Sequence, residues 1–554
     1  MKKLLFKLLA FALVIAMVLP GAAAFADDTE KPSYAWAKDP EKTYDNYEGK
    51  TVILHSNDVH GNIEGYTFIK GLKNYYEGMG AEVITVDAGD YIQGDPYVNL
   101  SKGKNAVTMM NAVGYDYAIL GNHEFDYGYA RQKKVLKKAN FKVLCADVFN
   151  SKGKTLYDAN AVWKSNKSDL KIGFFGMSTP ETQTKANPTL MVGLKFADGE
   201  ELYKIAQEQV DILSKKADIV IALTHLGIDA ESEPNTSYDL YKNTTGIDLI
   251  IDGHSHSTII TGPNGEPIQS TGTKFAYVGM IMIDNATKEI EQRELITADR
   301  LTAGFDKAVD KKAAKLIKKV DDKINVVFAK SEVDMPFAKG DENTPGVRNS
   351  ETAIGDLLVD AMLWMVTKDE GSVTVDRDHV VAITNGGGMR AEIKQGDITM
   401  KDIMTTYPFD NTVAVIYLTG KELLEVLEVS TSSTPAAMGG FPSVAGIQYT
   451  INTKKEYKAG KQVGDTLIYA PKKIKRVTIN SINGKEFNKN DTYAIVTNNF
   501  LADGGDTYYL FANATSKFDT GVVQNEAVIA YIQEVLGGVI GEEYAAPQGR
   551  IIIK

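Results

Sequence analysis

Six consecutive residues, Gly121-Asn122-His123-Glu124-Phe125-Asp126, combine side chains that can bind a metal ion and handle charge. They follow a short apolar run, residues 117–120, that predicts a buried strand. Asn122 offers a neutral oxygen, and His123 carries a nitrogen that titrates near neutral pH. Asp126, three residues later, can orient that imidazole. The segment could equally be an ordinary strand-to-helix turn, with Asn122 as the helix N-cap and Asp126 in the first turn.

The same design, an apolar run that ends in a metal-binding residue, recurs at four other places in the first half of the chain. The runs are 51–57 before Asp58-Val59-His60, 83–86 before Asp87-Ala88-Gly89-Asp90, 219–223 before Thr224-His225, and 249–251 before Asp252-Gly253-His254-Ser255-His256. Continuous apolar runs are typical of strands buried on both faces, and ligands gather at the carboxyl ends of strands in open α/β sheets. Each motif alone could be a polar turn or a buried histidine, but five in this order indicate one shared site.

The side chains of these motifs form a donor set of imidazole nitrogens and oxygens without a thiolate. Five of the seven histidines belong to it, together with two aspartates and one asparagine: His60, His123, His225, His254, His256, Asp58, Asp90 and Asn122. This mixture suits two divalent ions, and the sequence does not distinguish Zn²⁺, Mn²⁺, Co²⁺ and Mg²⁺. Two such ions bridged by a carboxylate would lie roughly 3.5–4 Å apart and generate a nucleophile for in-line attack on phosphorus.

The N-terminus has the pattern of a secretory signal peptide over residues 1–26. Lysines at positions 2, 3 and 7 precede an apolar run, residues 8–19, and a small-x-small cleavage site, Ala24-Phe25-Ala26. An uncleaved membrane anchor is the alternative, but the run is short and ends at Pro20-Gly21. We therefore expect cleavage after Ala26 and a mature protein outside the cytoplasm, in the periplasm or at the cell surface, without a membrane span.

The length and charge of the chain limit its organisation and its partners. A chain of 554 residues is too long for a single core, and a net charge of −11 argues against nucleic-acid binding through a basic surface. Loss of three lysines with the signal peptide would take this charge to −14. The single cysteine, Cys145, cannot form an internal disulfide and is expected to be a small buried residue.

Three segments follow the signal peptide. Residues 48–300 alternate apolar strands with helical stretches and predict an α/β domain. Residues 301–328 include a Lys/Asp-rich stretch with alanine and leucine at helical spacing, which predicts a linker helix. Residues 329–554 predict a second α/β domain, with a helix over 351–365 and strands at 380–384, 413–418, 447–451 and 493–497.

Three places in the second domain carry residues suited to binding a nucleotide. Asn385-Gly386-Gly387-Gly388-Met389-Arg390 combines glycines that allow close backbone approach with an arginine that can clamp an anion, although a flexible turn would look similar. Phe409 and Phe500 lie in predicted loops, the second beside a glycine turn with two carboxylates. Two such rings could sandwich a nucleobase, and core packing is the alternative for each.

The five metal-binding motifs, in this order, resemble those of the calcineurin-like metallophosphoesterase superfamily. The longer third motif resembles the secreted 5′-nucleotidase family, which includes ecto-5′-nucleotidase and the bacterial UDP-sugar hydrolases. The resemblance implies an N-terminal four-layer α/β/β/α metallophosphoesterase sandwich, a linker helix about which the domains rotate, and a C-terminal α/β substrate-binding domain.

The same resemblance implies a role for each site residue. One metal would be held by Asp58, His60, Asp90 and His256, and the other by Asp90, Asn122, His225 and His254. His123, paired with Asp126, would stabilise the phosphate in the transition state. Arg348, Asn385 and Arg390 match substrate-binding positions, Phe409 and Phe500 the base-stacking pair, and Asp506 the ribose-binding carboxylate. The chain departs from the family in carrying Asp503 where Asn is frequent, and in lacking the disulfides of the animal enzymes.

These observations predict a secreted, metal-dependent 5′-nucleotidase that hydrolyses nucleoside 5′-monophosphates to nucleoside and phosphate. The same site would serve a UDP-sugar, a 2′,3′-cyclic nucleotide, or a nucleoside di- or triphosphate. An inactive nucleotide-binding surface protein is the alternative from a different class, and the complete ligand set argues against it. The sequence makes no prediction about the oligomeric state.

Overall fold

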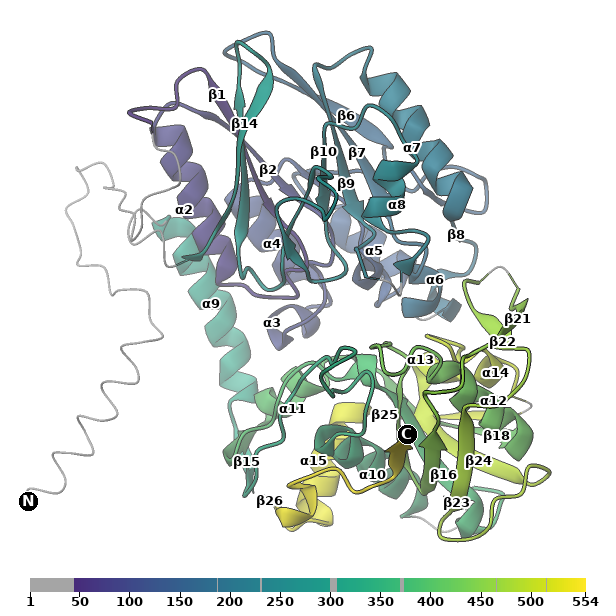
Figure 1. Ribbon diagram of the computed structural model, residues 1–554. Coiled ribbons are helices and arrows are strands. Elements are labelled where there is room, and N and C mark those ends of the chain that lie inside the picture. The colour runs from purple at the N-terminus through teal and green to yellow at the C-terminus, as the bar shows by residue number, and fades with distance from the viewer. Residues whose placement is uncertain are drawn as a thin grey trace, which may run out of the picture.

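The computed structural model describes residues 44–186, 188–229, 232–298, 306–368, 373–464, 466–514 and 516–554. Figure 1 shows two bodies, one above the other, joined along one side by the long helix α9 (Lys307–Ile324). The predicted signal peptide lies outside the described residues. Within the described ranges, none of the helices has both the length and the apolar character that crossing a bilayer requires.

The first body contains two six-stranded sheets. The first sheet has the order β14-β13-β1-β2-β3-β4, and the second has the order β11-β12-β10-β9-β7-β6. The strands of the first are β1 (Lys50–Ser56), β2 (Glu82–Asp87), β3 (Tyr117–Ala118), β4 (Lys142–Val143), β13 (Val278–Asp284) and β14 (Glu289–Ile296). Those of the second are β6 (Asn160–Lys164), β7 (Lys171–Ser178), β9 (Ile219–His225), β10 (Leu249–Asp252), β11 (Thr258–Ile259) and β12 (Ile268–Thr271).

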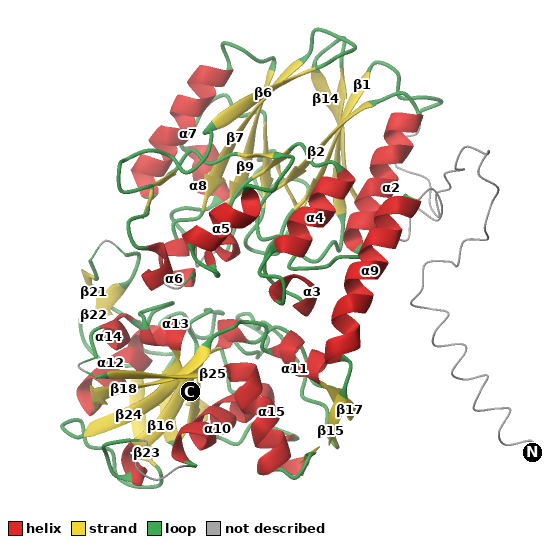
Figure 2. Cartoon of the chain, turned by 180° about the vertical axis from the view of Figure 1, so that it is seen from behind, coloured by secondary structure: helices red, strands yellow, loops and turns green. Residues whose placement is uncertain are grey.

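Helices cover the outer faces of the two sheets, as Figure 2 shows. Helices α2 (Gly65–Gly78) and α4 (Lys104–Val113) pack on the first sheet, and α7 (Gly199–Leu213) and α8 (Ser237–Lys242) on the second. Alternate residues of β1 explain the layering, because Val52 and Leu54 join the core under the helices while Ile53 joins the core between the sheets. The predicted four-layer α/β/β/α sandwich is therefore confirmed.

The register of the parallel strands brings the motif loops to one edge of the sheets. Ser56 of β1 pairs with Asp87 of β2, so the loops that carry Asp58 and Asp90 begin side by side. In the second sheet, β7, β9 and β10 are parallel and end at the same level. The apolar run 117–120 forms a ladder only over Tyr117–Ala118, although Ile119 and Leu120 remain buried. The chain therefore leaves the sheet two residues earlier than predicted.

Several short elements connect these strands. They are α3 (Pro96–Asn99), η1 (Asn122–Phe125), α5 (Tyr129–Leu136), β5 (Val148–Phe149), α6 (Thr182–Lys185), η2 (Pro188–Met191) and β8 (Lys195–Phe196). Of these, η1 and α6 lie toward the second body and carry residues of the candidate site.

The second body is built around a five-stranded mixed sheet with the order β19-β16-β24-β18-β25. Its strands are β16 (Val380–Asn385), β18 (Thr412–Thr419), β19 (Pro442–Ala445), β24 (Thr492–Asn498) and β25 (Lys517–Val523). Helices α10 (Ala353–Thr367) and α15 (Gln524–Glu534) pack on one face, and α12 (Gly420–Ser430) packs on the other. Helix α10 begins and ends two residues later than the predicted helix, and the predicted strands match within a residue at each end.

The remaining elements of the second body form small sheets and short helices around this core. They are β15 (Val327–Ser331), β17 (Gly396–Thr399), α11 (Met400–Thr406), β20 (Ile447–Ile451), β21 (Ala459–Gln462), β22 (Tyr469–Pro471), β23 (Val477–Ile482), α13 (Asn499–Ala502), α14 (Tyr509–Ala512), β26 (Val539–Ile540) and β27 (Ile551–Ile553), with 3₁₀ turns η5 (Arg377–His379), η6 (Gly386–Gly388) and η7 (Glu542–Tyr544).

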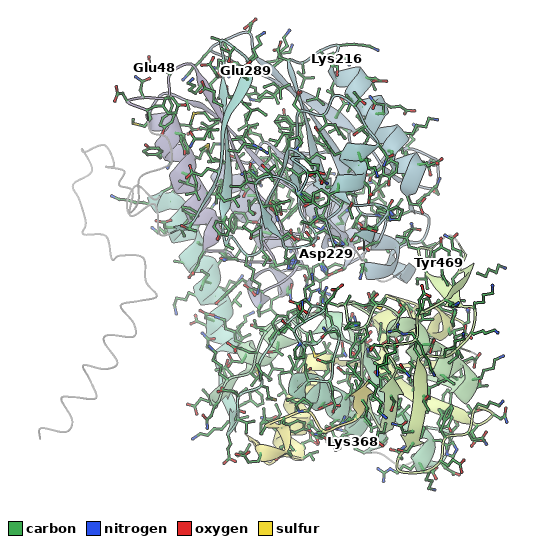
Figure 3. All side chains as sticks on the ribbon, viewed as in Figure 1. Glu48, Lys216, Asp229, Glu289, Lys368 and Tyr469 are labelled. Atoms are coloured by element: carbon green, nitrogen blue, oxygen red, sulfur yellow. The ribbon has the colours of Figure 1, made fainter. Side chains whose placement is uncertain are left out.

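Helix α9 packs on the first body and leads the chain into the second. The Asp306 carboxylate accepts hydrogen bonds from the amides of Ala308 and Val309 and caps the first turn. Val309 and Ala313 belong to the same core as α2 and α4. The two bodies also meet away from this helix, near Asp229, which Figure 3 labels. There Lys339 Nζ lies 2.9 Å from Asp229 Oδ2.

Candidate metal centre and substrate pocket

The loops at the strand ends hold several predicted ligands in the left-handed region of the backbone. Asp58, His60, Asp90, His254 and His256 all have φ between 43° and 82°. Residues with a Cβ rarely adopt this conformation, and it costs on the order of 1 kcal/mol or more for each. Five such residues at the same edge of the sheets indicate a functional site whose side chains must point in set directions.

One group of predicted ligands gathers around Asp58. His256 Nε2 lies 3.4 Å from Asp58 Oδ1, and His60 Nε2 lies 3.9 Å from the same oxygen. His60 Nε2 is also 3.8 Å from Asp90 Oδ2. The nitrogens of His60 and His256 face each other at 3.0 Å. One ligand atom each from Asp58, His60 and His256 lies within 4.8 Å of the other two, close enough for these residues to share one ion.

A second group gathers on the other side of Asp90. His225 Nε2 lies 3.1 Å from Asp90 Oδ2, and His254 Nδ1 lies 3.0 Å from Asn122 Oδ1. Asp90 Oδ2 therefore contacts a histidine of each group, as a carboxylate that bridges two ions would, and Asp58 Oδ1 also lies within 4.0 Å of His225 Nε2. The sequence places Asn122 and His254 in separate motifs, and the fold brings them into contact.

The donor set fits divalent cations. His225 Nδ1 donates to the Ala88 carbonyl at 2.7 Å, so in the neutral ring, the form that binds a metal ion, the Nε2 atom carries the lone pair. That Nε2 atom is buried and has no hydrogen-bond partner. An unpaired buried nitrogen next to a carboxylate, and two imidazole nitrogens 3.0 Å apart, are stable when a cation lies between them.

The charge of Asp90 suits a bridging ligand. Burial opposes its charged form, but the imidazoles of His225 and His123 outweigh this and hold the pKa of the Asp90 carboxyl well below its usual range. Burial, with the charge of Asp90, raises the pKa of Asp58 to about 6. Of these two carboxylates, that of Asp90 thus keeps its charge to the lower pH.

Glu124, inside the third motif, supports the centre without facing it. Its buried carboxylate accepts hydrogen bonds from the amides of Asp90 at 2.8 Å and Gly121 at 2.7 Å, and also from those of Tyr91 and Ile92. This fixes the two loops that carry Asp90 and Asn122 relative to each other. Sequence reasoning did not assign a role to Glu124, although its place in the motif was a signal.

His123 and Asp126 form a buried pair beside the metal centre. His123 Nδ1 donates to Asp126 Oδ2 at 2.7 Å, and the His123 amide donates to Asp90 Oδ1 at 2.9 Å. Burial lowers the pKa of His123, but the carboxylates of Asp126 and Asp90 outweigh it and raise that pKa overall. The alternative of Asn122 as a helix N-cap is wrong, because Gly121 occupies that position and the Asn122 side chain faces His254.

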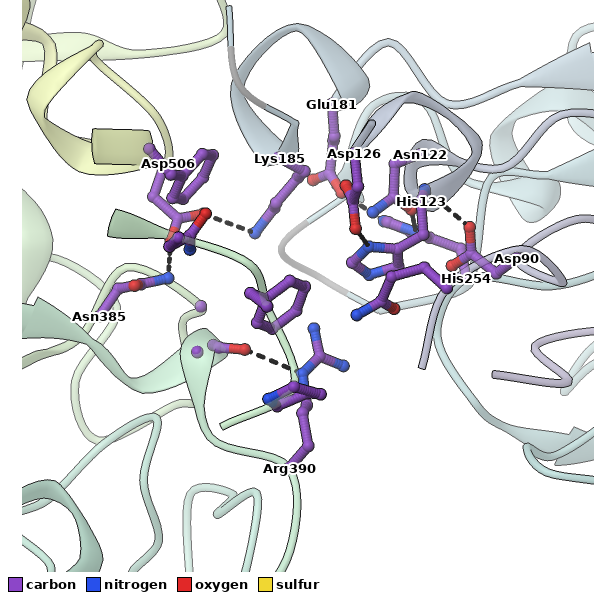
Figure 4. A pocket seen from close by; sticks show the side chains of 18 of the residues that line it. Asp90, Asn122, His123, Asp126, Glu181, Lys185, His254, Asn385, Arg390 and Asp506 are labelled. Carbon is purple, nitrogen blue, oxygen red and sulfur yellow. Dashed lines mark hydrogen bonds and ion pairs between the residues drawn. The ribbon is translucent and has the colours of Figure 1, made fainter. Parts of the chain in front are cut away.

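A cavity of about 460 Å³ lies between the two bodies and contains most of the predicted site residues (Figure 4). From the first body, its lining includes Asp90, Asn122, His123, Asp126, His254 and His256. From the second, it includes Arg348, Asn385, Arg390, Phe409, Phe500 and Asp506. The other predicted ligands, Asp58, His60 and His225, are buried and are not part of the cavity lining.

The glycines of residues 386–388 allow the backbone to pack closely beneath the part of the cavity formed by the second body. A Cβ on Gly386 would lie 1.8 Å from the Val347 carbonyl oxygen, so only glycine allows this contact. The contact places the backbone of Arg348 beside the motif. Arg390 is partly buried, donates from Nε to the Gly387 carbonyl at 2.9 Å, and stacks on Phe409 with its guanidinium 5.2 Å from the ring centroid. Burial, with the charge of Arg348, lowers the pKa of Arg390 to about 10, so it stays charged at neutral pH.

The two predicted base-stacking rings differ in their surroundings. Phe409 is partly exposed, and its ring centroid lies 5.7 Å from that of His123. Phe500 is 8% exposed and packs against Gly505 in the core of the second body, so its ring both fills the core and lines the cavity. Asn385 Nδ2 donates to Asp506 Oδ2 at 2.7 Å, which places these two predicted residues together.

Two residues of the segment that follows β7 were missed by sequence reasoning. Glu181 and Lys185 line the cavity next to His254 and Asp506 (Figure 4). Glu181 lies three residues after the end of β7, a strand that sequence reasoning did not single out, and Lys185 lies in no recognisable motif.

Comparison with known proteins matches both bodies. The calcineurin-like phosphoesterase family matches residues 51–258, and the 5′-nucleotidase C-terminal domain family matches residues 327–513. A 5′-nucleotidase of Vibrio vulnificus is 26% identical over 98% of this chain and 99% of its own. The trifunctional nucleotide phosphoesterase protein YfkN of Bacillus subtilis is 29% identical over 86% of this chain, which spans 33% of that longer protein.

Solved structures agree with these sequence matches. The 5′-nucleotidase precursor of Thermus thermophilus has a TM-score of 0.74 and 26% identity, and the likeness covers 91% of this chain and 99% of that one. The likeness therefore extends over both bodies and the linker. The chain is a phosphoric ester hydrolase that belongs to the 5′-nucleotidase family of calcineurin-like metallophosphoesterases.

Proposed function

We propose that this protein is a metal-dependent 5′-nucleotidase that converts nucleoside 5′-monophosphates to nucleoside and phosphate. The observation that supports this most directly is the shared cavity, which is lined by four of the seven predicted metal ligands on one side and by the predicted nucleotide-binding residues on the other. A nucleotide in that cavity would have its phosphate near His123 and its base near Phe500.

The metal centre would be formed by the two groups that meet at Asp90. Asp58, His60, Asp90 and His256 would hold one divalent ion, and Asp90, Asn122, His225 and His254 the other. Two ions bound there would supply an activated water and neutralise charge on the phosphoryl group. Asp90 stays ionised between the two groups, and Glu124 keeps its loop in place.

His123 and the arginines would bind the phosphoryl group. The imidazole of His123, whose pKa Asp126 and Asp90 raise and which Asp126 holds through Nδ1, would when protonated present Nε2 as a hydrogen-bond donor to an oxygen whose negative charge grows in the transition state. Arg390 and Arg348 both line the cavity and would hold the phosphate as a pair of cations.

The nucleoside would be held by the second body. Phe409 and Phe500 would contact the base, since aromatic faces stack on nucleobases without sequence-specific hydrogen bonds. Asp506, oriented by Asn385 at 2.7 Å, would accept hydrogen bonds from the ribose hydroxyls. Binding energy on the nucleoside would thus be used to place the phosphorus at the metal centre.

Phosphate release from a panel of substrates tests this proposal. The panel contains AMP, UMP, ATP, UDP-glucose and 2′,3′-cyclic AMP, each with Mn²⁺, Zn²⁺ or Co²⁺. We expect hydrolysis of the monophosphates, loss of activity with a chelator, and a drop of about 100-fold or more in His123→Ala. His379→Ala is the matched control, because His379 pairs with Asp378 and Asp491 on the surface of the second body.

The other outcomes of the panel separate the alternatives. Activity confined to UDP-glucose or the cyclic nucleotide would keep the mechanism and change the substrate, and the description of the Bacillus relative as trifunctional makes this the second candidate. No release from any nucleotide by metal-loaded protein would instead support an inactive nucleotide-binding protein.

Export is also part of the proposal. The sequence of residues 1–26 has the composition of a signal peptide. N-terminal sequencing of the protein recovered outside the cytoplasm is expected to begin at Asp27, and a chain that begins at Met1 would contradict cleavage.

A further inference from the structure

Glu181 contacts a predicted metal ligand from a segment outside the metal-binding motifs. It follows β7 in the sequence Thr179-Pro180-Glu181, and its side chain is buried. Its Oε2 atom lies 2.5 Å from His254 Nε2 (Figure 4). The backbone on both sides is tied down, because the Glu181 amide donates to Thr179 Oγ1 at 3.2 Å and the Lys185 amide donates to the Glu181 carbonyl at 2.7 Å.

This contact determines which nitrogen of His254 faces the metal centre. A carboxylate can only accept a hydrogen bond, so Nε2 of His254 carries a proton. The other nitrogen, Nδ1, faces Asn122 Oδ1 at 3.0 Å. When Nδ1 is unprotonated, it and the amide oxygen present two lone pairs to each other, an arrangement that a cation between them stabilises.

Two of the other predicted histidine ligands, His225 and His60, show the opposite arrangement. His225 Nδ1 donates to the Ala88 carbonyl, and His60 Nδ1 lies 3.3 Å from the Gln93 carbonyl, so both present Nε2 to the centre. Backbone carbonyls hold these two rings. The ring of His254 has the reverse orientation, with Nδ1 toward the centre, and the side chain of Glu181 holds it instead of a backbone carbonyl.

We propose that Glu181 is a positioning residue that fixes His254 as an Nδ1 ligand of the second metal ion. The inference rests on the proposed metal centre, but it concerns metal binding and does not depend on which phosphoester is hydrolysed. A carboxylate on the far side of a ligating imidazole also increases the electron density on the ligating nitrogen, and removal of such a partner typically costs about 10- to 100-fold in metal affinity.

Metal titration of Glu181→Gln tests the proposal. Glutamine has the same shape, but its amide group can donate to Nε2 and so favour the wrong tautomer of His254. By calorimetry with Mn²⁺, we expect the wild type to bind two ions and the variant to bind one of them about 10- to 100-fold more weakly. Glu208→Gln on the exposed face of α7 is the matched control and should bind as the wild type does. Two ions bound by Glu181→Gln with unchanged affinities would overturn the proposal.

A second measurement does not depend on the folding of any Glu181 variant. In metal-free wild type labelled with ¹⁵N-histidine, we expect the His254 signals, identified by their loss in His254→Gln, to show a proton on Nε2. A predominant Nδ1–H tautomer would contradict the assignment. Two ions bound by a wild type that hydrolyses no nucleotide would refute the proposed function and leave this inference standing.

Discussion

Lys185 and Asp506 face each other across the cavity from opposite bodies of the protein. Lys185 ends helix α6 in the first body, Asp506 lies in the second, and Nζ is 3.8 Å from Oδ1 (Figure 4). Asp506 also accepts a hydrogen bond from Asn385. The ion pair therefore joins the segment that holds His254 to the carboxylate proposed to bind ribose.

Lys185→Met should weaken substrate binding more than turnover. Removal of this partly exposed ion pair costs about 0.5–1 kcal/mol, so we expect KM to rise roughly two- to fivefold with little change in kcat. Lys195→Met is the matched control, because Lys195 pairs with Glu201 on the surface. Equal KM values for Lys185→Met and the control would show that the ion pair does not contribute to binding.

Asp126→Asn should change the pH dependence of the reaction. Asp126, with Asp90, raises the pKa of His123 against the effect of burial, so the charged imidazole persists to a higher pH in the wild type. Without the carboxylate that pKa falls, and the alkaline limb of the kcat profile should move to lower pH. Profiles of both proteins at saturating substrate check this, and coincident alkaline limbs would rule out a charged His123 in turnover.

Phe409→Ala and Phe500→Ala should separate base stacking from core packing. Stacking on a base contributes about 1–3 kcal/mol, so both variants should raise KM by roughly 5- to 100-fold. Phe409 is partly exposed, and its loss should leave the unfolding temperature nearly unchanged. Phe500 is buried against Gly505, and its loss should also cost about 3 kcal/mol of stability. Kinetics and thermal unfolding of both variants provide the comparison, and a stable Phe500→Ala would argue against its role in the core.

Asp147 should make the protein less stable as the pH rises. Its carboxyl is buried, Oδ2 accepts from the Ser178 amide at 2.8 Å, and burial raises its pKa to about 8. In the unfolded chain this carboxyl titrates at roughly pH 4. Between roughly pH 4 and about pH 8 the folded state therefore binds more protons than the unfolded state, and the free energy of unfolding falls as the pH rises.

Asp147→Asn removes this titration. The free energy of unfolding of the variant relative to the wild type should therefore increase between pH 5 and pH 8, on the order of a few kcal/mol. Urea unfolding at the two pH values measures the change. Asp169→Asn, at an exposed position, is the control, and an identical difference at both pH values would contradict a buried titration at Asp147.

The metal-binding motifs could be read from the sequence because each is local. An apolar run followed within a few residues by Asp, Asn or His specifies both a buried strand and the side chains at its end. Parallel strands end at one edge, so the order of the motifs was enough to predict that Asp58, Asp90 and His225 would meet. The local pattern predicted the end of a strand less reliably, as residues 117–120 show. The length of a strand depends on how far the neighbouring strand continues to pair with it.

The relations between distant side chains were decided by the tertiary structure. Glu181 and His254 are 73 residues apart, and nothing in the sequence around Glu181 indicates that its carboxylate reaches an imidazole. The contact of Phe409 with His123 and that of Lys185 with Asp506 depend on how the two bodies pack. The sequence by itself determined which residues could bind metal and nucleotide, since residue type and local spacing carry that information. Only the folded chain decided which nitrogen of each ring faces the centre and which charges meet across the cavity, because these follow from packing between elements far apart in sequence.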